Sequence, residues 1–185
     1  MSYGTVMARF LREVQKRGIK TSVDVVSANE PDFGKKVVPV LKYCNYLIVN
    51  ELECCAIWGL EARTPSGALD RANVELAMKK TVEAGVKDRV IVHCKECAFL
   101  MDAHQNLTVV ASLRIPKEEI KGAVGAGDAF CAGCLYGIYS GYGDREILEF
   151  ASAAAACNLF ADNSVDGMKT KSEILALAQK YGRIE

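Results

Sequence analysis

Gly125-Ala126-Gly127-Asp128-Ala129-Phe130 is the most informative segment of this 185-residue chain. Two glycines on either side of an alanine allow a tight turn in which successive backbone N–H groups point toward one spot. The small and apolar residues that follow predict a helix that opens directly behind the glycines, and the N-terminus of a helix carries partial positive charge. The segment therefore predicts an anion-binding site that suits a phosphoryl group.

Asp128 places a carboxylate in the first turn of this predicted helix, beside any phosphate bound there. Such a carboxylate can accept the proton of a substrate hydroxyl while that hydroxyl attacks phosphorus. An acid in a first helical turn is also favoured by the helix dipole, whatever the chemistry, so both explanations stay open for this residue. The reaction that the pattern favours is phosphorylation of an alcohol.

A second motif, Asn50-Glu51-Leu52-Glu53, follows an apolar run at 46–49. The run predicts a short buried strand, and open α/β sheets bind their ligands at the carboxyl ends of strands. An asparagine with a glutamate three residues later is also the pattern of a helix capping box. A cap is compatible with a role in magnesium binding, because Mg²⁺ keeps several waters and needs few direct protein carboxylates.

The two motifs together resemble those of the ribokinase-like (PfkB) family of carbohydrate and nucleoside kinases. The family's Gly-Ala-Gly-Asp is matched at 125–128, with the usual Ala-Phe and the later small residue Gly133, and its Asn-x-x-Glu is matched at 50–53. The resemblance implies an α/β fold of three layers, with a mainly parallel ribokinase-like (Rossmann-like) sheet flanked by helices. It also implies ATP and Mg²⁺ as cofactors.

The implied reaction moves the γ-phosphoryl group of ATP to the hydroxyl of a sugar or sugar-like alcohol. By resemblance, Asp128 is the catalytic base, and Asn50 with Glu53 helps to hold Mg²⁺. The residues expected to bind the phosphates of the cofactor through their N–H groups are Gly125, Ala126 and Gly127.

Members of this family are longer than the present chain. The resemblance predicts that residues 1–185 form a single, partial ATP-side domain that lacks the N-terminal lid and sugar-binding part. Two functions follow: an active sugar kinase, or a catalytically inactive nucleotide-binding or structural remnant of one. An uncovered sheet edge and apolar face would favour a homo-oligomer or a partner chain that covers the missing half.

The composition agrees with a globular domain, since 50% of the residues are hydrophobic and 25% are charged. The 23 basic and 23 acidic residues cancel, which removes the electrostatic footprint expected for binding to nucleic acid or to an anionic membrane. No apolar run approaches the ~20 residues that a membrane-spanning helix needs, and the N-terminus lacks a signal-peptide pattern. We therefore expect a cytoplasmic protein with no nucleic-acid or membrane partner.

Eight cysteines without a secretory signal favour free thiols over a disulfide framework. Cys94-x-x-Cys97 and Cys131-x-x-Cys134 have the local spacing of a four-thiolate zinc site, but the two pairs lie much farther apart than in familiar zinc sites. Buried small hydrophobic residues are the preferred interpretation, and a zinc or thiol-redox module is a third hypothesis. His93 ends a predicted strand, where a structural role is favoured over catalysis.

The rest of the chain alternates helical and strand patterns. The predicted helices, one of them with Asp144 as its N-cap, are 7–17, 33–41, 52–58, 69–85, 129–139, 145–160 and 172–181. The predicted strands are 19–26, 46–49, 90–93, 98–101 and 107–110.

Overall fold

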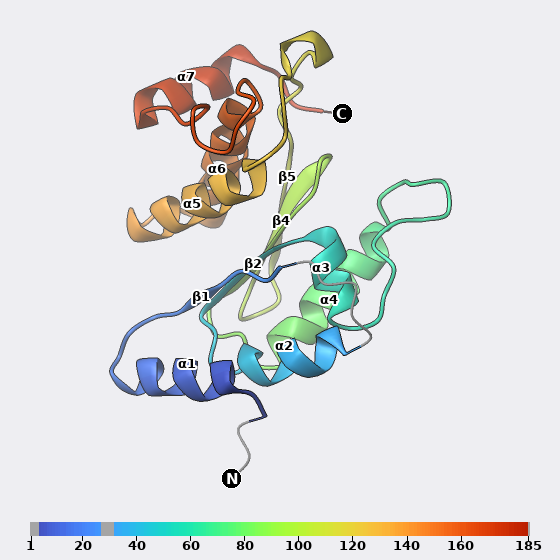
Figure 1. The fold of residues 1–185 in the computed structure, drawn as a ribbon, viewed down its shortest axis with the longest axis vertical. Coiled ribbons are helices and arrows are strands. Elements are labelled where there is room, and N and C mark those ends of the chain that lie inside the picture. Colours follow the sequence, from blue (N-terminus) through green and yellow to red (C-terminus); the bar gives the residue numbers. More distant parts are fainter. Residues whose placement is uncertain (1–3, 27–31, 185) are drawn as a thin grey trace. The chain divides into compact units, whose positions relative to one another are not determined.

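The computed structural model describes residues 4–26 and 32–184 and has an α/β fold (Figure 1). Its five strands, in the order β1-β2-β3-β4-β5, are β1 (Ser22–Val23), β2 (Tyr46–Asn50), β3 (Arg89–His93), β4 (Cys97–Asp102) and β5 (Leu107–Ala111). The α-helices of the described residues are α1 (Val6–Lys16), α2 (Phe33–Leu41), α3 (Glu51–Ala56), α4 (Arg71–Glu83), α5 (Ala126–Tyr139), α6 (Asp144–Asn158) and α7 (Lys171–Lys180), with a short 3-10 helix at η1 (Lys117–Glu119). The predicted class, a sheet flanked by helices, is confirmed.

The chain divides into two compact units. The first is Met1–Val92 with Leu100–Leu107, and the second is His93–Phe99 with Thr108–Glu185. A single domain over the whole chain stays a prediction, and each unit is described by itself.

The sheet is mixed rather than mainly parallel. β1 runs parallel to β2, with Ser22 opposite Tyr46, and α3 and α4 give the connection from β2 to β3 the length that a parallel crossover needs. The connections after β3 and β4 span only residues 94–96 and 103–106, and neighbouring strands joined by such short turns run antiparallel. The expected parallel arrangement therefore applies only to β1, β2 and β3.

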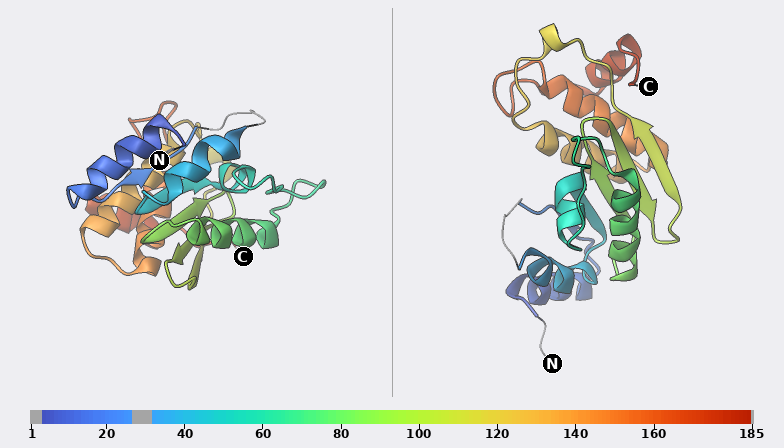
Figure 2. Two further views of the ribbon diagram at one scale, coloured as in Figure 1. Left: turned by 90° about the horizontal axis from the view of Figure 1, so that it is seen from below. Right: turned by 90° about the vertical axis from the view of Figure 1, so that its right-hand side faces the viewer.

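In the first unit, α1 to α4 gather along one face of β1 and β2 (Figures 1 and 2). Leu47, Ile48 and Val49 in β2 are at most 1% exposed, as the uninterrupted apolar run at 46–49 predicts for a buried parallel strand. Helix α1 ends as predicted, because Gly18 takes the left-handed conformation (φ 74°) that closes a helix. The apolar spacing of this segment therefore located both the helix and its end.

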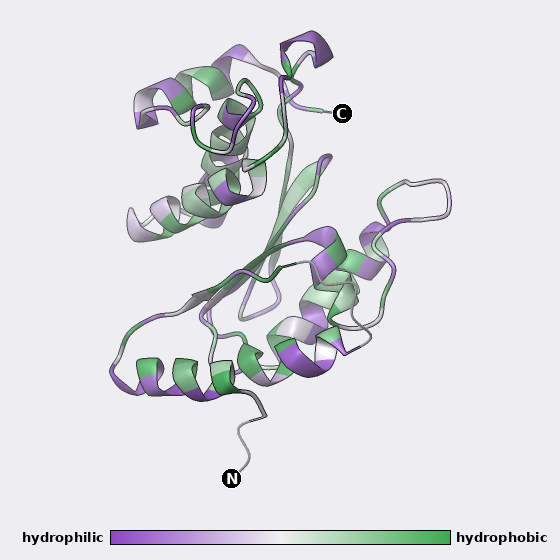
Figure 3. Cartoon of the chain, in the orientation of Figure 1, coloured by the Kyte–Doolittle hydropathy of each residue, from purple (hydrophilic) through white to green (hydrophobic). Residues whose placement is uncertain are grey.

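Strand β1 is shorter than the predicted strand over 19–26. Ile19 and Val26 are 55% and 87% exposed, and only Ser22 and Val23 pair with β2. Hydrophobic and hydrophilic positions alternate along helix α1 (Figure 3). Among its apolar residues, Val6 and Phe10 are exposed to solvent. Such surfaces are consistent with association, but the expected self-association stays a prediction.

In the second unit, α5 packs closely on α6, and α6 packs on α7. A Cβ atom at Gly133 of α5 would lie 2.7 Å from the Cα of Ala151 in α6, so the approach of these two helices requires glycine. Phe150, Cys157 and Ile174 form part of the apolar core beneath them. None of the helices in the described residues has the length and hydropathy to cross a bilayer.

All three α-helices in this unit start before the predicted residue, α7 by a single residue. Helix α5 begins at Ala126, three residues before the predicted start. Helix α6 begins at Asp144 itself, because the extended residue Gly143 is the N-cap and its N–H donates to Glu146 Oε2 at 2.8 Å. The predicted Asp144 cap is therefore wrong.

Candidate functional site

The N-terminus of α5 has no side-chain cap. Its N-cap is Gly125, in the left-handed conformation with φ 81°. Within the described residues, the N–H groups of Gly125, Gly127 and Asp128 have no hydrogen-bond partner, whereas that of Ala126 donates to the carbonyl of Ala123 at 3.2 Å. Unpaired N–H groups and the positive end of the helix dipole together attract an anion.

The turn before α5 requires glycine at position 125. A Cβ atom built on it would lie 2.5 Å from Ser164 Cβ, 2.6 Å from its Cα and 2.7 Å from its carbonyl oxygen. The positive φ disfavours any other residue as well. Two independent constraints, one from the local conformation and one from a segment after α6, therefore require glycine here.

Asp128 is the third residue of α5, so its predicted place in the first helical turn is confirmed. Its side chain is exposed, and no hydrogen bond or ion pair holds it among the described residues. A carboxylate in this position is available to accept a proton from a group that approaches the N-terminus of the helix.

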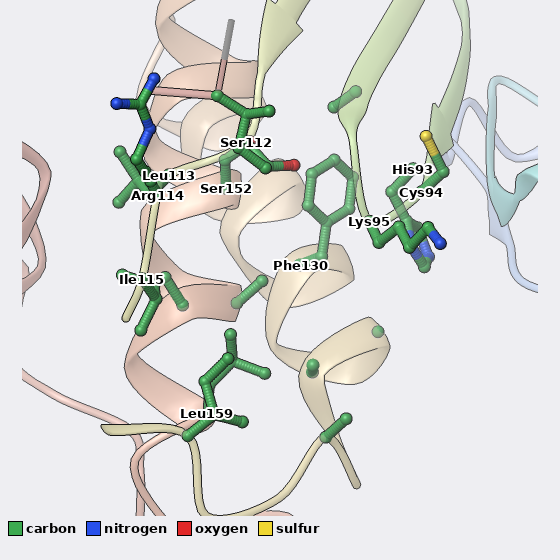
Figure 4. A pocket seen from close by; sticks show the side chains of 18 residues that line it. His93, Cys94, Lys95, Ser112, Leu113, Arg114, Ile115, Phe130, Ser152 and Leu159 are labelled. Carbon is green, nitrogen blue, oxygen red and sulfur yellow. The ribbon is translucent and has the colours of Figure 1, made fainter. Parts of the chain in front are cut away.

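A cavity of about 510 Å³ opens beside the same turn (Figure 4). Its volume falls within the range of ordinary small-molecule sites. Ala126 and Gly127 belong both to the first turn of α5 and to the wall of the cavity. The wall is mainly aliphatic, with polar contributions that include His93, Lys95 and Ser152. A ligand in this cavity would lie next to the unpaired N–H groups.

Ser152, on α6, is a part of this wall that the sequence analysis missed. It is 8% exposed, and its Oγ has no hydrogen-bond partner in the part of the chain that the structure describes. A buried hydroxyl without a partner is unfavourable, so it marks a place where a ligand can supply the missing hydrogen bond. The only signal in the sequence is a single serine within a run of alanines at 151–156.

His93 ends β3, as predicted, and also borders the site. Its ring centroid is 4.8 Å from that of Phe130, and a Cβ atom at Gly127 would lie 3.5 Å from His93 Cε1. The imidazole thus lies against the first turn of α5. From the sequence, a structural role was favoured for His93 over catalysis, and nothing placed it at this site.

Asn50 and Glu53 form the capping box of α3, in the first unit. The N–H of Glu53 donates to Asn50 Oδ1 at 2.8 Å, and the N–H of Asn50 donates to Glu53 Oε2 at 3.0 Å. Glu53 is 7% exposed, as is its neighbour Glu51, which pairs with the guanidinium of Arg63. The cap is therefore confirmed, and the magnesium role stays a prediction.

Asn50 and Glu53 can supply only part of the oxygen ligands that Mg²⁺ needs. Among residues 4–26 and 32–184, no three His, Cys, Asp or Glu side chains come together in a group that could hold a metal. Mg²⁺ bound with nucleotides commonly takes one or two carboxylates and completes its shell with phosphate and water oxygens. One carboxylate and one amide oxygen suit that kind of binding.

The cysteines do not form the four-thiolate cluster that their spacing allowed. All eight are free thiols, and the absence of a metal-binding group among the described residues includes Cys94, Cys97, Cys131 and Cys134. Cys134 is fully buried, as the preferred interpretation predicted, whereas Cys131 is partly exposed.

Comparisons with known proteins agree on the kind of protein that this chain resembles. The family model described as "pfkB family carbohydrate kinase" matches residues 5–171. A 5-dehydro-2-deoxygluconokinase of Listeria innocua is 39% identical over 61 residues, which are 33% of this chain and 19% of that protein. The corresponding enzyme of Shouchella clausii is 36% identical over 64 residues, which are 35% and 20% of the two chains.

Solved structures of similar fold include Arabidopsis thaliana ribokinase complexed with ribose and ATP, with a TM-score of 0.76 and 23% identity over 94% of this chain and 52% of that one. A candidate ribokinase II of Escherichia coli, in complex with ATP and Mg²⁺, aligns with a TM-score of 0.74 and 22% identity over 92% and 52% of the two chains. The chain thus spans about half the length of these structures. Because the family model covers most of its residues, the chain belongs to the pfkB family of carbohydrate kinases.

Proposed function

We propose that this chain carries the nucleotide side of an ATP-dependent carbohydrate kinase, which transfers the γ-phosphoryl group of ATP to a sugar hydroxyl. The observation that carries the proposal is the uncapped N-terminus of α5, whose first residues also form the wall of a 510 Å³ cavity. A nucleotide bound there would have its base in the aliphatic cavity and its phosphates at the unpaired N–H groups. Membership of the pfkB family supports this assignment.

The residues in and around the turn share the catalytic work in this proposal. Asp128 accepts the proton of the attacking sugar hydroxyl. The unpaired N–H groups of Gly125 and Gly127 donate to oxygens of the transferring phosphoryl group, where negative charge must be stabilised. His93 and Phe130 cover one side of the turn and reduce the access of water.

Ser152 completes the cavity end of the site by offering its unpaired hydroxyl to a polar atom of the nucleotide. Asn50 and Glu53 are the residues that would help to hold Mg²⁺, a cation that neutralises charge on the phosphates of ATP.

Nucleotide binding and turnover test this function together. Saturation with Mg-ATP at about 100 times its Kd should raise the free energy of unfolding by about 2.7 kcal/mol. Sugar-dependent release of ADP is then measured with ribose and 5-dehydro-2-deoxygluconate, the sugars that the names of the relatives contain. Binding of Mg-ATP without turnover of any sugar would favour the inactive remnant, and absence of both would reject the proposed site.

Substitutions can separate the two roles proposed for Glu53, which are to cap α3 and to help hold Mg²⁺. Glu53→Gln should leave the cap intact, because glutamine also accepts the hydrogen bond of a capping box. It removes the negative charge, so the Mg²⁺ concentration that gives half-maximal ATP-dependent stabilisation or turnover should rise several-fold. Asn50→Ala, in contrast, removes the cap and should lower the free energy of unfolding by about 0.5–2 kcal/mol.

Glu173→Gln is the matched control, because Glu173 fills the same capping position at the start of α7, where the N–H of Thr170 donates to it at 2.9 Å. This variant should not change the Mg²⁺ requirement. An unchanged Mg²⁺ requirement in Glu53→Gln as well would leave Glu53 as a structural cap only.

A further inference from the structure

Cys94 and Cys97 face each other across the turn between β3 and β4. Their Sγ atoms are 3.8 Å apart, and the backbone N–H of Cys94 donates to the carbonyl of Cys97 at 3.0 Å. Hydrogen-bonded residue pairs in antiparallel strands have Cα atoms about 5.5 Å apart, which is within the range of disulfide-bonded cysteines. A disulfide between them therefore requires rotation of the side chains and no large movement of the backbone.

Exposure separates this pair from most other cysteines of the chain. Cys94 and Cys97 are partly exposed, as is Cys131, whereas the fully buried cysteines are Cys44, Cys54, Cys55, Cys134 and Cys157. Burial raises the pKa of Cys44 and of Cys55 to about 12, so these thiols remain protonated and inert. An oxidant in solution thus meets three accessible thiols, and two of them are neighbours.

The hydrogen bonds of Cys94 give the two sulfur atoms different reactivity. Its thiol donates to the carbonyl of Cys97 at 3.1 Å, and the pKa of Cys94 is raised by its hydrogen bond with the Cys97 side chain and by burial. Cys94 therefore keeps its proton while Cys97 is free of modification. In the sequence of steps that we infer, Cys97 reacts first, and its modification removes the side-chain hydrogen bond that raises the pKa of Cys94.

We propose that Cys94 and Cys97 are a redox-active dithiol, which a low-molecular-weight disulfide such as glutathione disulfide converts reversibly into an intramolecular disulfide. The thiolate of Cys97 attacks glutathione disulfide, so a Cys97–glutathione bond forms and one glutathione thiolate leaves. The thiolate of Cys94 then attacks Cys97 Sγ, and the second glutathione leaves. The two cysteines lose two electrons to the glutathione disulfide, and their two protons pass to the released glutathione thiolates.

The dithiol borders the cavity beside α5, because Cys94 and Lys95 line its wall. Disulfide formation brings the two sulfur atoms from 3.8 Å to about 2.0 Å, which moves the Cys94 side chain and fixes the turn that carries Lys95. We therefore expect a ligand in the cavity and the redox state of the pair to influence each other. For a nucleotide this link rests on the proposed function, and we expect oxidation to weaken its binding about fivefold or more.

To test the dithiol, the folded chain is treated with glutathione disulfide, and the remaining thiols are then blocked with N-ethylmaleimide. The products are digested with trypsin and mapped by mass spectrometry. Cleavage after Lys95 separates the two cysteines, so their disulfide appears as two cross-linked peptides. We expect this cross-link in the wild type and in the matched control Cys131→Ser, and its loss on treatment with dithiothreitol. Cys94→Ser should stop at a glutathione mixed disulfide on Cys97, because the resolving thiol is missing.

Two results would overturn the dithiol: a stable glutathione adduct at Cys94 or Cys97 without a cross-link in the wild type, or no reaction of either while Cys131 is modified. Titration of a fluorescent ATP analogue into the reduced and oxidised forms then tests the link to the cavity. Equal affinities would reject the link. No binding in either form would reject the proposed nucleotide site, while the peptide map still decides whether the dithiol exists.

Discussion

The Asp128→Asn variant is expected to lose about 10²- to 10⁴-fold in kcat, the range that a positioned general base contributes. Asparagine keeps the shape of the side chain and loses only the ability to take the proton of the sugar hydroxyl. The affinity for Mg-ATP should stay within a few-fold of the wild type, because Asp128 is exposed and is held by no hydrogen bond or ion pair among the described residues. The measurement is sugar-dependent ADP release at saturating substrates, with Mg-ATP affinity determined separately.

A control variant tests the alternative explanation for Asp128, that the helix dipole alone favours an acid at this position. Asp144→Asn makes the same change in the first turn of α6 and should affect only stability, by about 0.3–1 kcal/mol. If Asp128→Asn behaves like Asp144→Asn, with a wild-type kcat, then Asp128 takes no part in proton transfer.

Gly125→Ala is expected to have the largest effect on nucleotide binding. Alanine at φ 81° costs about 1–2 kcal/mol, and its Cβ would also meet Ser164 atoms at 2.5–2.7 Å. Because two of these atoms belong to the backbone, the clash can be relieved only by displacing the turn, which also moves the unpaired N–H groups of Gly127 and Asp128. The stabilisation by Mg-ATP should therefore disappear, and the free energy of unfolding without ligand should fall by more than the conformational cost alone.

Gly141→Ala is the matched control, because Gly141 has a similar φ of 74° and a Cβ atom there would meet no described residue within 4 Å. It should lose only the conformational cost, about 1–2 kcal/mol in denaturant titrations, and keep its full response to Mg-ATP. Equal losses in the two variants, with Mg-ATP binding retained in both, would show that the close approach of Ser164 does not hold the turn.

The sequence could predict those structural features that depend on residues close together in the chain. The capping box at Asn50 and Glu53 is formed by residues three positions apart, so its pattern and its hydrogen bonds coincide. The buried strand at 46–49 and the glycine end of α1 also follow from neighbouring residues. The same holds for Asp128, whose place in a first helical turn depends on the residues directly around it.

Predictions that depended on distant residues were less accurate. The length of β1 is limited by how many of its residues meet β2, and the expected strand over 19–26 contained no information about that partner. The order and direction of the strands follow from which connections are long enough to cross over, so a mainly parallel sheet became a mixed one. Helix α5 starts at Ala126 because Gly125 takes a left-handed turn, which the general flexibility of glycine permits but does not specify.

The sequence by itself determined the family, the glycine turn and the carboxylate beside it, since these are contained in short motifs whose chemistry is local. Only the tertiary structure placed the Ser164 backbone behind Gly125, the unpaired hydroxyl of Ser152 at the cavity wall and His93 against the first turn of α5. It also showed that Cys94 and Cys97 are a close pair on a turn rather than half of a zinc cluster. Contacts between segments far apart in the chain depend on packing and burial, which arise only when those segments meet in space.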